Sequence, residues 1–166
     1  MRHKFLLLCL ATLPGCAPTV QSYTLTQTYN EAEFTPFAGA GPASLNGQAF
    51  LKTVGGDVKT CAGNQVFLVP STPYNDEVIA HTRVGEPLAN RDSRATQFTR
   101  VSICDASGKF TFDRIPAKKW YVVTKVTWGV PSEYGINQQG GEVLQVVDLK
   151  NGVNQAILTD ADRTHH

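Results

Sequence analysis

The stretch GKFTFDRIPAKKWYVVTKVTW (108–128) decides the fold class of this 166-residue chain. Polar and apolar residues alternate in its first part, KFTFD (109–113), and again in the longer run 119–128. An alternation with a period of two is typical of a β-strand with one buried face. The sequence therefore predicts two strands, of which the second places on one face Trp120, Val122, Val126 and Trp128.

The same alternation extends outward from this stretch in both directions. It predicts further strands at residues 45–53, 65–69, 97–104, 141–149 and 153–159. Asp-Ala-Ser-Gly (105–108) and Lys-Asn-Gly (150–152) stand between pairs of these runs, and both are favoured hairpin turns. About seven strands, with turn signals every 8–12 residues, predict one all-β domain, an antiparallel β-sandwich.

One segment departs from the alternation. Residues 71–85 offer Thr72 as a helix N-cap, Pro73 at the first helical position and Gly85 as a stop. The pattern predicts a short helical insertion, followed by an irregular loop.

Five short motifs of the predicted strands resemble the carboxypeptidase regulatory-like domain, which has a transthyretin-like fold. The resemblance implies a transthyretin-like β-sandwich over residues 45–160, and it is closest over 45–127. It departs from the family pattern where Lys118 and Lys119, rather than Gly, precede the aromatic residue. The motifs are Gly47, Val66 to Pro70, Gly108 to Phe112, Ile115-Pro116 and Tyr121 to Val123.

The N-terminus carries the features of an export signal. Residues 1–15 combine a basic head, a short apolar run and small or turn-forming residues, which is the layout of a signal peptide. Leu13-Pro14-Gly15-Cys16 resembles the bacterial lipobox, which implies cleavage before Cys16 and its acylation. Ala17, where Asp would favour the inner membrane, implies a lipid anchor in the outer membrane, with the domain facing the periplasm.

Two segments lack a sustained pattern. Residues 16–44 comprise the lipidated Cys16 and a predicted flexible tether, and residues 161–166 predict a frayed C-terminal tail. The tether contains more aromatic residues than a solvated linker needs, namely Tyr23, Tyr29, Phe34 and Phe37. These side chains therefore pack on the domain, dock on a partner or stay exposed.

Composition narrows the function further. Export removes two of the 15 basic residues and none of the 14 acidic ones, so that the mature formal charge is −1. This near-neutral charge gives no electrostatic footprint for nucleic acid. Cys61 and Cys104 remain as a pair, which in an exported chain predicts a disulfide within the chain or, alternatively, a bridge between two chains.

The chain shows no nucleophile elbow, P-loop or zinc-binding motif, so we expect no catalytic residues, metal or cofactor. A transthyretin-like subfamily that hydrolyses hydroxyisourate ends in Tyr-Arg-Gly-Ser. This chain ends Asp-Arg-Thr-His-His (162–166), so that activity is not implied.

Two loops remain as candidate interaction surfaces, unless they are simply solvated or packed on the sandwich. They favour a non-enzymatic lipoprotein that binds a protein partner, by analogy an accessory of an envelope complex such as a secretion system. The alternative is a carbohydrate- or peptidoglycan-binding module that uses loop aromatics. The candidate residues are Arg83, Arg91, Arg94 and Arg100 in one loop, and Trp128 and Tyr134 in the other.

Overall fold

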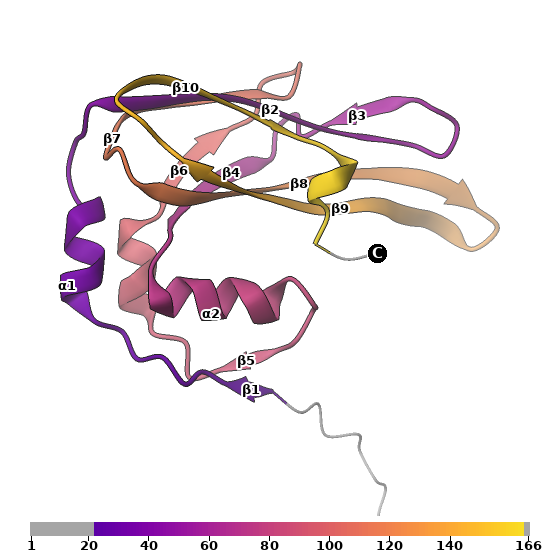
Figure 1. The fold of residues 1–166 in the computed structure, drawn as a ribbon. Helices are drawn as coiled ribbons and strands as arrows, with labels where there is room; N and C mark the ends of the chain where they lie inside the picture. The colour runs from indigo at the N-terminus through magenta and orange to yellow at the C-terminus, as the bar shows by residue number, and fades with distance from the viewer. Residues whose placement is uncertain (1–21, 165–166) are drawn as a thin grey trace, which may run out of the picture.

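The structure of the protein is a computed structural model that describes residues 22–164. Two four-stranded sheets face each other in a β-sandwich (Figure 1). This confirms an all-β fold with a short helix. One sheet holds β10 (Gly152–Leu158), β2 (Ala43–Lys52), β7 (Lys109–Ile115) and β3 (Val58–Thr60). The other has the order β6 (Arg100–Ile103), β4 (Gln65–Pro70), β8 (Lys119–Ser132) and β9 (Gly135–Asp148).

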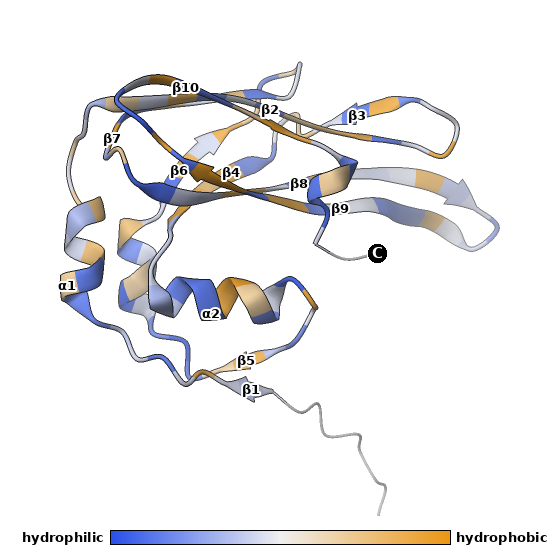
Figure 2. Cartoon of the chain, viewed as in Figure 1, coloured by the Kyte–Doolittle hydropathy of each residue, from blue (hydrophilic) through white to orange (hydrophobic). Residues whose placement is uncertain are grey.

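The core lies between the sheets and is built by the predicted alternation. In β2, Leu45, Ala49 and Leu51 are fully buried. Trp120 opens the buried face of β8, and its indole N–H donates to the carbonyl of Pro116 at 3.1 Å. Apolar and polar residues alternate along the strands of both sheets in Figure 2.

A disulfide joins Cys61, just after β3, to Cys104, just after β6. Their Cα atoms are 5.7 Å apart. The bond links the two sheets at one end of the sandwich, and it is the predicted pairing within the chain.

The connections differ from the prediction. Neither Asp-Ala-Ser-Gly (105–108) nor Lys-Asn-Gly (150–152) closes a hairpin, because each carries the chain from one sheet to the other. β7 pairs with β2 rather than with β6. β10 runs parallel to β2, with Gly152 opposite Ala43, so the fully antiparallel sandwich is wrong for this pair. The same turn residues are compatible with a hairpin within one sheet and with a connection between two sheets. The burial of strand side chains between the sheets favours the connection.

The tether prediction is wrong for residues 22–44. This segment contains β1 (Tyr23–Thr24), α1 (Glu31–Phe34) and a 3₁₀ turn (Thr35–Phe37), and β2 begins within it. Phe34 is fully buried and Phe37 nearly so. The aromatic residues therefore pack on the domain, the first of the three alternatives. The predicted signal peptide and the predicted acylation site Cys16 lie outside the described residues.

The C-terminal tail is also ordered as far as residue 164. Arg163 forms a bridge with Val143 of β9, and the Thr164 amide donates to the carbonyl of Glu142 at 3.1 Å. A free edge of β9 attracts the chain here, so residues 161–164 are not frayed. Residues 165–166 lie outside the described part.

The predicted helix is α2 (Pro73–Thr82), capped by the Thr72 side chain, which accepts from the Asn75 amide at 3.2 Å. The expected irregular loop instead holds β5 (Leu88–Ala89), paired with β1, and a 3₁₀ helix, η2 (Ser93–Phe98). These elements form a third layer beside the β6-β4-β8-β9 sheet (Figure 1). Among residues 22–164, no helix has both the length and the apolar character needed to cross a bilayer.

Candidate functional site

The outer face of the β6-β4-β8-β9 sheet carries an apolar row that crosses all four strands. Phe67 lies opposite Val101 on one side and Val123 on the other, and Val123 lies opposite Leu144. Phe67 keeps 36% of its surface exposed and Val101 keeps 53%. A large aromatic side chain is therefore presented to solvent from the middle of a rigid sheet.

A polar row runs beside the apolar one. Gln65 lies two residues before Phe67, and Lys125 lies two residues after Val123 and opposite Glu142. Residues two apart on a strand share a face and lie ~6.6 Å apart. The polar row thus holds an amide, an ammonium and a carboxylate ~6.6 Å along the strands from the apolar row.

The helical layer turns this face into a groove. Two adjoining cavities, of about 470 and 400 Å³, share Phe67, Val123 and Glu142 on their floor. The first is walled by α2, through Asn75, Val78, Ile79 and Thr82, and by η2 and the segment before it. The second opens toward Asn64, Gln65 and Lys125.

The side chains of the polar row have unused hydrogen-bonding capacity. Within residues 22–164, the half-buried carboxylate of Glu142 makes neither a hydrogen bond nor an ion pair. The side chains of Gln65 and Lys125 are exposed and likewise have no partner in this part of the chain. Three polar groups beside an apolar floor are thus available to a ligand, as in small-molecule sites in general.

The rim of the groove is fixed by hydrogen bonds. The amide of Asp92 donates to the Tyr74 hydroxyl at 2.6 Å, which ties the rim to α2. The Asp92 carboxylate accepts from the Arg94 guanidinium at 2.6 Å and from the Arg94 amide at 2.9 Å. These bonds lower the pKa of Asp92, and the same ion pair raises the pKa of Arg94. The acid at the rim is therefore neutralised within the chain.

The four predicted arginines do not form one free surface. Arg94 pairs with Asp92 and lies 4.5 Å from the ring centre of Tyr29, and Arg100 donates to the carbonyls of Phe37 and Gly39. Arg83 and Arg91 are exposed. Of these two, Arg91 lines the groove.

The two predicted loop aromatics are far apart. Trp128 is half-buried and packs against the core, whereas Tyr134 is 95% exposed at the turn between β8 and β9. Trp128 lies four residues before the end of β8, or ~13 Å along the strand. The pair therefore does not form a single stacking platform.

Phe67 and Glu142 were not among the predicted site residues. The run QVFLV (65–69) reads as one continuous apolar strand, in which Phe67 does not stand out from its neighbours. The available signal is the alternation itself, because Val66 and Leu68 are fully buried and Phe67 must then point outward. Nothing in the local sequence of Glu142 places it beside Phe67, since 75 residues separate them.

In the described part of the chain, no three His, Cys, Asp or Glu side chains gather closely enough to hold a metal ion.

Comparison with known proteins supports the fold. No protein-family model and no curated protein sequence matches the chain. Among solved structures, it is similar to the crystal structure of a "putative carbohydrate binding protein" from Pseudomonas aeruginosa, with a TM-score of 0.68 and 23% sequence identity. The similarity covers 80% of this chain and 98% of that one. At this level of identity, the likeness shows a shared fold.

Proposed function

We propose that this protein is a saccharide-binding module whose site is the groove over the β6-β4-β8-β9 sheet. The observation that carries the proposal is Phe67, an exposed aromatic side chain beside the polar row of Gln65, Lys125 and Glu142, whose side chains have no partner within residues 22–164. The name of the Pseudomonas aeruginosa structure points to the same class of ligand. Binding, without a catalytic step, is the activity that we propose.

The chemistry of a sugar matches the two rows. One face of a pyranose ring carries C–H groups, which pack against the flat surface of an aromatic ring. Its edge carries hydroxyl groups, which donate to a carboxylate and accept from an amide or an ammonium group. A ring on Phe67 would direct its edge toward Lys125 and Glu142, one row away.

We further propose that the mature protein begins at the acylated Cys16 and is anchored in the outer membrane, facing the periplasm. The lipobox-like Leu13-Pro14-Gly15-Cys16 supports this. We also infer that the sandwich is of the carboxypeptidase regulatory-like, transthyretin-like type. Its motif residues Gly47 and Phe110 support this, because they lie opposite each other on β2 and β7 and the Phe110 ring packs over Gly47.

The test is a binding titration of the purified full-length chain in detergent with maltohexaose, cellohexaose and chitohexaose. We expect saturable binding of at least one hexaose. Phe67→Ala should weaken it about tenfold, since an aromatic contact contributes roughly 0.5–1.5 kcal/mol beyond its buried area. Glu142→Gln should weaken it as well, because a charged acceptor is lost.

Tyr134→Ala is the matched control, because it removes an exposed aromatic residue outside the groove. Its affinity should equal that of the wild type. An equal loss in Tyr134→Ala and Phe67→Ala would remove the groove from the proposal. Failure of all three sugars, together with a crosslinked envelope protein lost in Arg83→Glu/Arg91→Glu, would favour the protein-partner hypothesis.

A further inference from the structure

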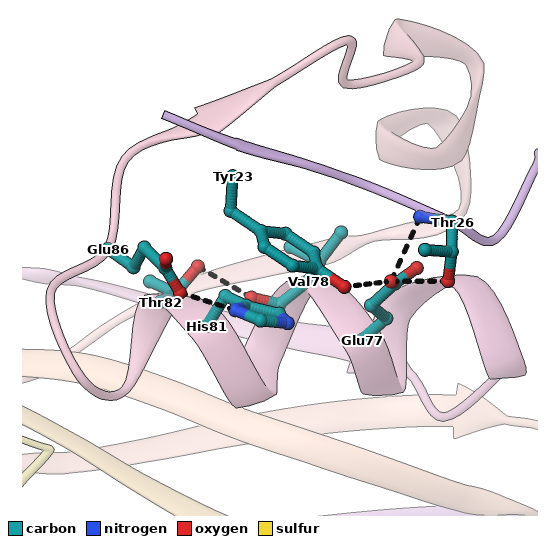
Figure 3. Close-up of polar contacts among 7 residues, drawn as sticks. All are labelled: Tyr23, Thr26, Glu77, Val78, His81, Thr82 and Glu86. Carbon is teal, nitrogen blue, oxygen red and sulfur yellow. Dashed lines mark hydrogen bonds and ion pairs between the residues drawn. The ribbon is translucent and has the colours of Figure 1, made fainter. Parts of the chain in front are cut away.

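Residues 23–39 form an N-terminal strap, whose first part lies along the side of α2 that faces away from the sheet (Figure 1). Its main contact is Glu77 of α2 (Figure 3). The Glu77 carboxylate accepts hydrogen bonds from the Tyr23 hydroxyl at 3.0 Å, the Thr26 amide at 2.9 Å, the Thr26 hydroxyl at 2.7 Å and the Gln27 amide at 2.7 Å. One carboxylate thus holds four donors of the strap.

A second contact lies one helical turn further on. The Tyr23 ring stacks on His81 with ring centres 3.5 Å apart, and His81 Nδ1 lies 2.6 Å from a Glu86 carboxylate oxygen. Figure 3 shows Tyr23 lying across this face of α2. The stack and the Glu77 bonds hold the same end of the strap on the helix.

The strap also holds the segment that forms the rim of the groove. The Asn90 side chain accepts from the Leu25 amide at 3.0 Å and donates to the Leu25 carbonyl at 3.3 Å. Asn90 itself has a φ of 51°, an unusual conformation for a non-glycine residue that these two bonds support. The next two residues, Arg91 and Asp92, line the groove.

Below these bonds lies a small apolar core separate from that of the sandwich. It joins the strap, through Leu25 and Phe34, to α2, through Tyr74 and Val78, and to η2, through Ala95. Tyr74, Val78 and Ala95 also line the groove. The same side chains therefore pack on the strap and shape the binding cavity.

The polar contacts of α2 with the strap lie on a different side of the helix from the groove. Asn75, Val78, Ile79 and Thr82 recur every three to four residues and line the groove. Glu77 and His81, one turn apart, contact the strap on another side of the helix. Because the helix is a rigid body, a change at one side is carried to the other.

We propose that Glu77 is a positioning residue and that docking of the strap sets the affinity of the groove. This proposal rests on the proposed saccharide site. With the strap bound to α2 and Asn90, the wall and the rim are held in the binding geometry. With the strap released, α2 and the 88–92 segment lose their support. The groove then samples a wider range of conformations, and fewer of them bind the ligand. By linkage, a ligand that prefers the docked state also tightens the strap by the same factor.

The test compares Glu77→Ala, which removes all four acceptor contacts, with Glu31→Ala in the same strap. The exposed carboxylate of Glu31 makes no hydrogen bond among the described residues, so the second variant is a matched control. Hydrogen exchange is measured for the amides of Thr26, Gln27 and Asp92, and affinity for the tightest-binding of the three hexaoses.

We expect Glu77→Ala to speed exchange at all three amides and to weaken hexaose binding about fivefold or more, within the usual range of coupling between sites. The saturating hexaose should slow exchange of the Thr26 and Gln27 amides in the wild type, a reciprocal effect that a merely structural role does not produce. Glu31→Ala should change none of these values.

Faster exchange at Thr26 and Gln27 with unchanged exchange at Asp92 and unchanged affinity would overturn the proposal. If Glu77→Ala does not fold, Tyr23→Phe provides the same comparison, because it removes one donor and keeps the stacked ring. If no hexaose binds to the wild type, the proposed function fails. The Asp92 amide, which donates to Tyr74 in the groove wall, then still reports whether strap and rim are coupled.

Discussion

Gly47 of β2 lies directly beneath the ring of Phe110 in the core. A Cβ atom at this position would lie 2.1 Å from the ring carbon at the tip of Phe110. The ring is 4% exposed and packs edge-on against Phe112, so it cannot move aside freely. The glycine is needed for close approach rather than for backbone freedom.

Gly47→Ala should therefore destabilise the fold by about 1–3 kcal/mol, the usual cost of overpacking a core. Urea unfolding followed by tryptophan fluorescence measures the change. Gly55→Ala is the control, because its nearest side-chain atom would be 3.8 Å away. Equal urea midpoints for Gly47→Ala and Gly55→Ala would show that the side chains around Phe110 can move aside for the added Cβ atom.

Glu77 also sets an acid limit for the strap. Partial burial raises its pKa, but the hydrogen bonds from Thr26, Gln27 and Tyr23 outweigh this effect and lower the pKa to about 2. A carboxylate with a depressed native pKa stabilises the fold above its unfolded pKa, and the stabilisation is lost as the pH falls toward the native value.

The strap should therefore stay docked at neutral pH and loosen as the pH falls from about 4.5 to 2. Hydrogen exchange of the Thr26 amide, corrected for its intrinsic pH dependence, measures this. In Glu77→Gln the strap should be looser at pH 7, with a much smaller acid response. A wild-type profile as flat as that of the variant would contradict the assignment to Glu77.

At the scale of elements, the disulfide connects the end of β3 to the end of β6 across 43 residues. This loop contains β4, α2, β5 and η2, so the bond restrains the whole groove-forming insertion. In the chain-entropy model, closing a loop of this length stabilises the fold by about 4 kcal/mol.

Cys61→Ser/Cys104→Ser should lose about this amount, or somewhat less, in urea unfolding. The disulfide is buried in the core of the sandwich and not in the small core that joins the strap to α2. We therefore expect the double variant, while folded, to retain the exchange rates of Thr26 and Gln27. Labelling of Cys61 and Cys104 by a thiol reagent in the denatured, unreduced wild type would disprove the bond.

Local sequence predicted the elements well and their connections poorly. β7, β8 and α2 follow from alternation and from the Thr72 cap, both of which are local signals. The turn after Cys104 looks like a hairpin, because Asp105 accepts from the amides of Ser107 and Lys109, yet it joins the two sheets. Side-chain packing at a distance decides that outcome, and short turns do not encode it.

The site was harder to predict than the fold for the same reason. Arg91 was selected from a loop, and it does line the groove. Phe67 and Glu142 come from strands far apart in the chain, and only the β4-β8-β9 register brings them to one face. The strap escaped prediction because its helix spans only Glu31–Phe34 and its β1 only two residues, too few for any periodicity to show.

At the scale of the whole molecule, the chain forms three layers. The β1–β5 pair and α2 lie on one side, the β6-β4-β8-β9 sheet in the middle, and the sheet of β10, β2 and β7 on the far side (Figure 1). The strap is held on α2 from Tyr23 onward. Any restraint on the chain just before residue 23 therefore also restrains how the three layers are oriented.

This changes what a lipid on Cys16 would do. A flexible tether of 28 residues would let the domain move over ~100 Å of contour length. With Tyr23 fixed on α2, Cys16 lies seven positions earlier in the chain, a span of at most ~25 Å. An acylated Cys16 would therefore hold the β1–β5 side close to the bilayer, with the far sheet turned away.

We expect this orientation in vesicles that carry the acylated protein and nitroxide-labelled lipid headgroups. The amide signals of Leu88 and Ala89 in β5 should broaden more than that of Thr111 in β7, because β5 pairs with the strap and β7 lies in the far sheet. Inserting about 20 Gly/Ser residues after Gln21 should remove the difference, since a coil of that length lets the domain tumble.

Cys16→Ser should leave the vesicles altogether. Equal broadening of β5 and β7 in the unmodified chain would mean that the short span does not orient the domain. Membrane association of Cys16→Ser would instead disprove the lipid anchor itself.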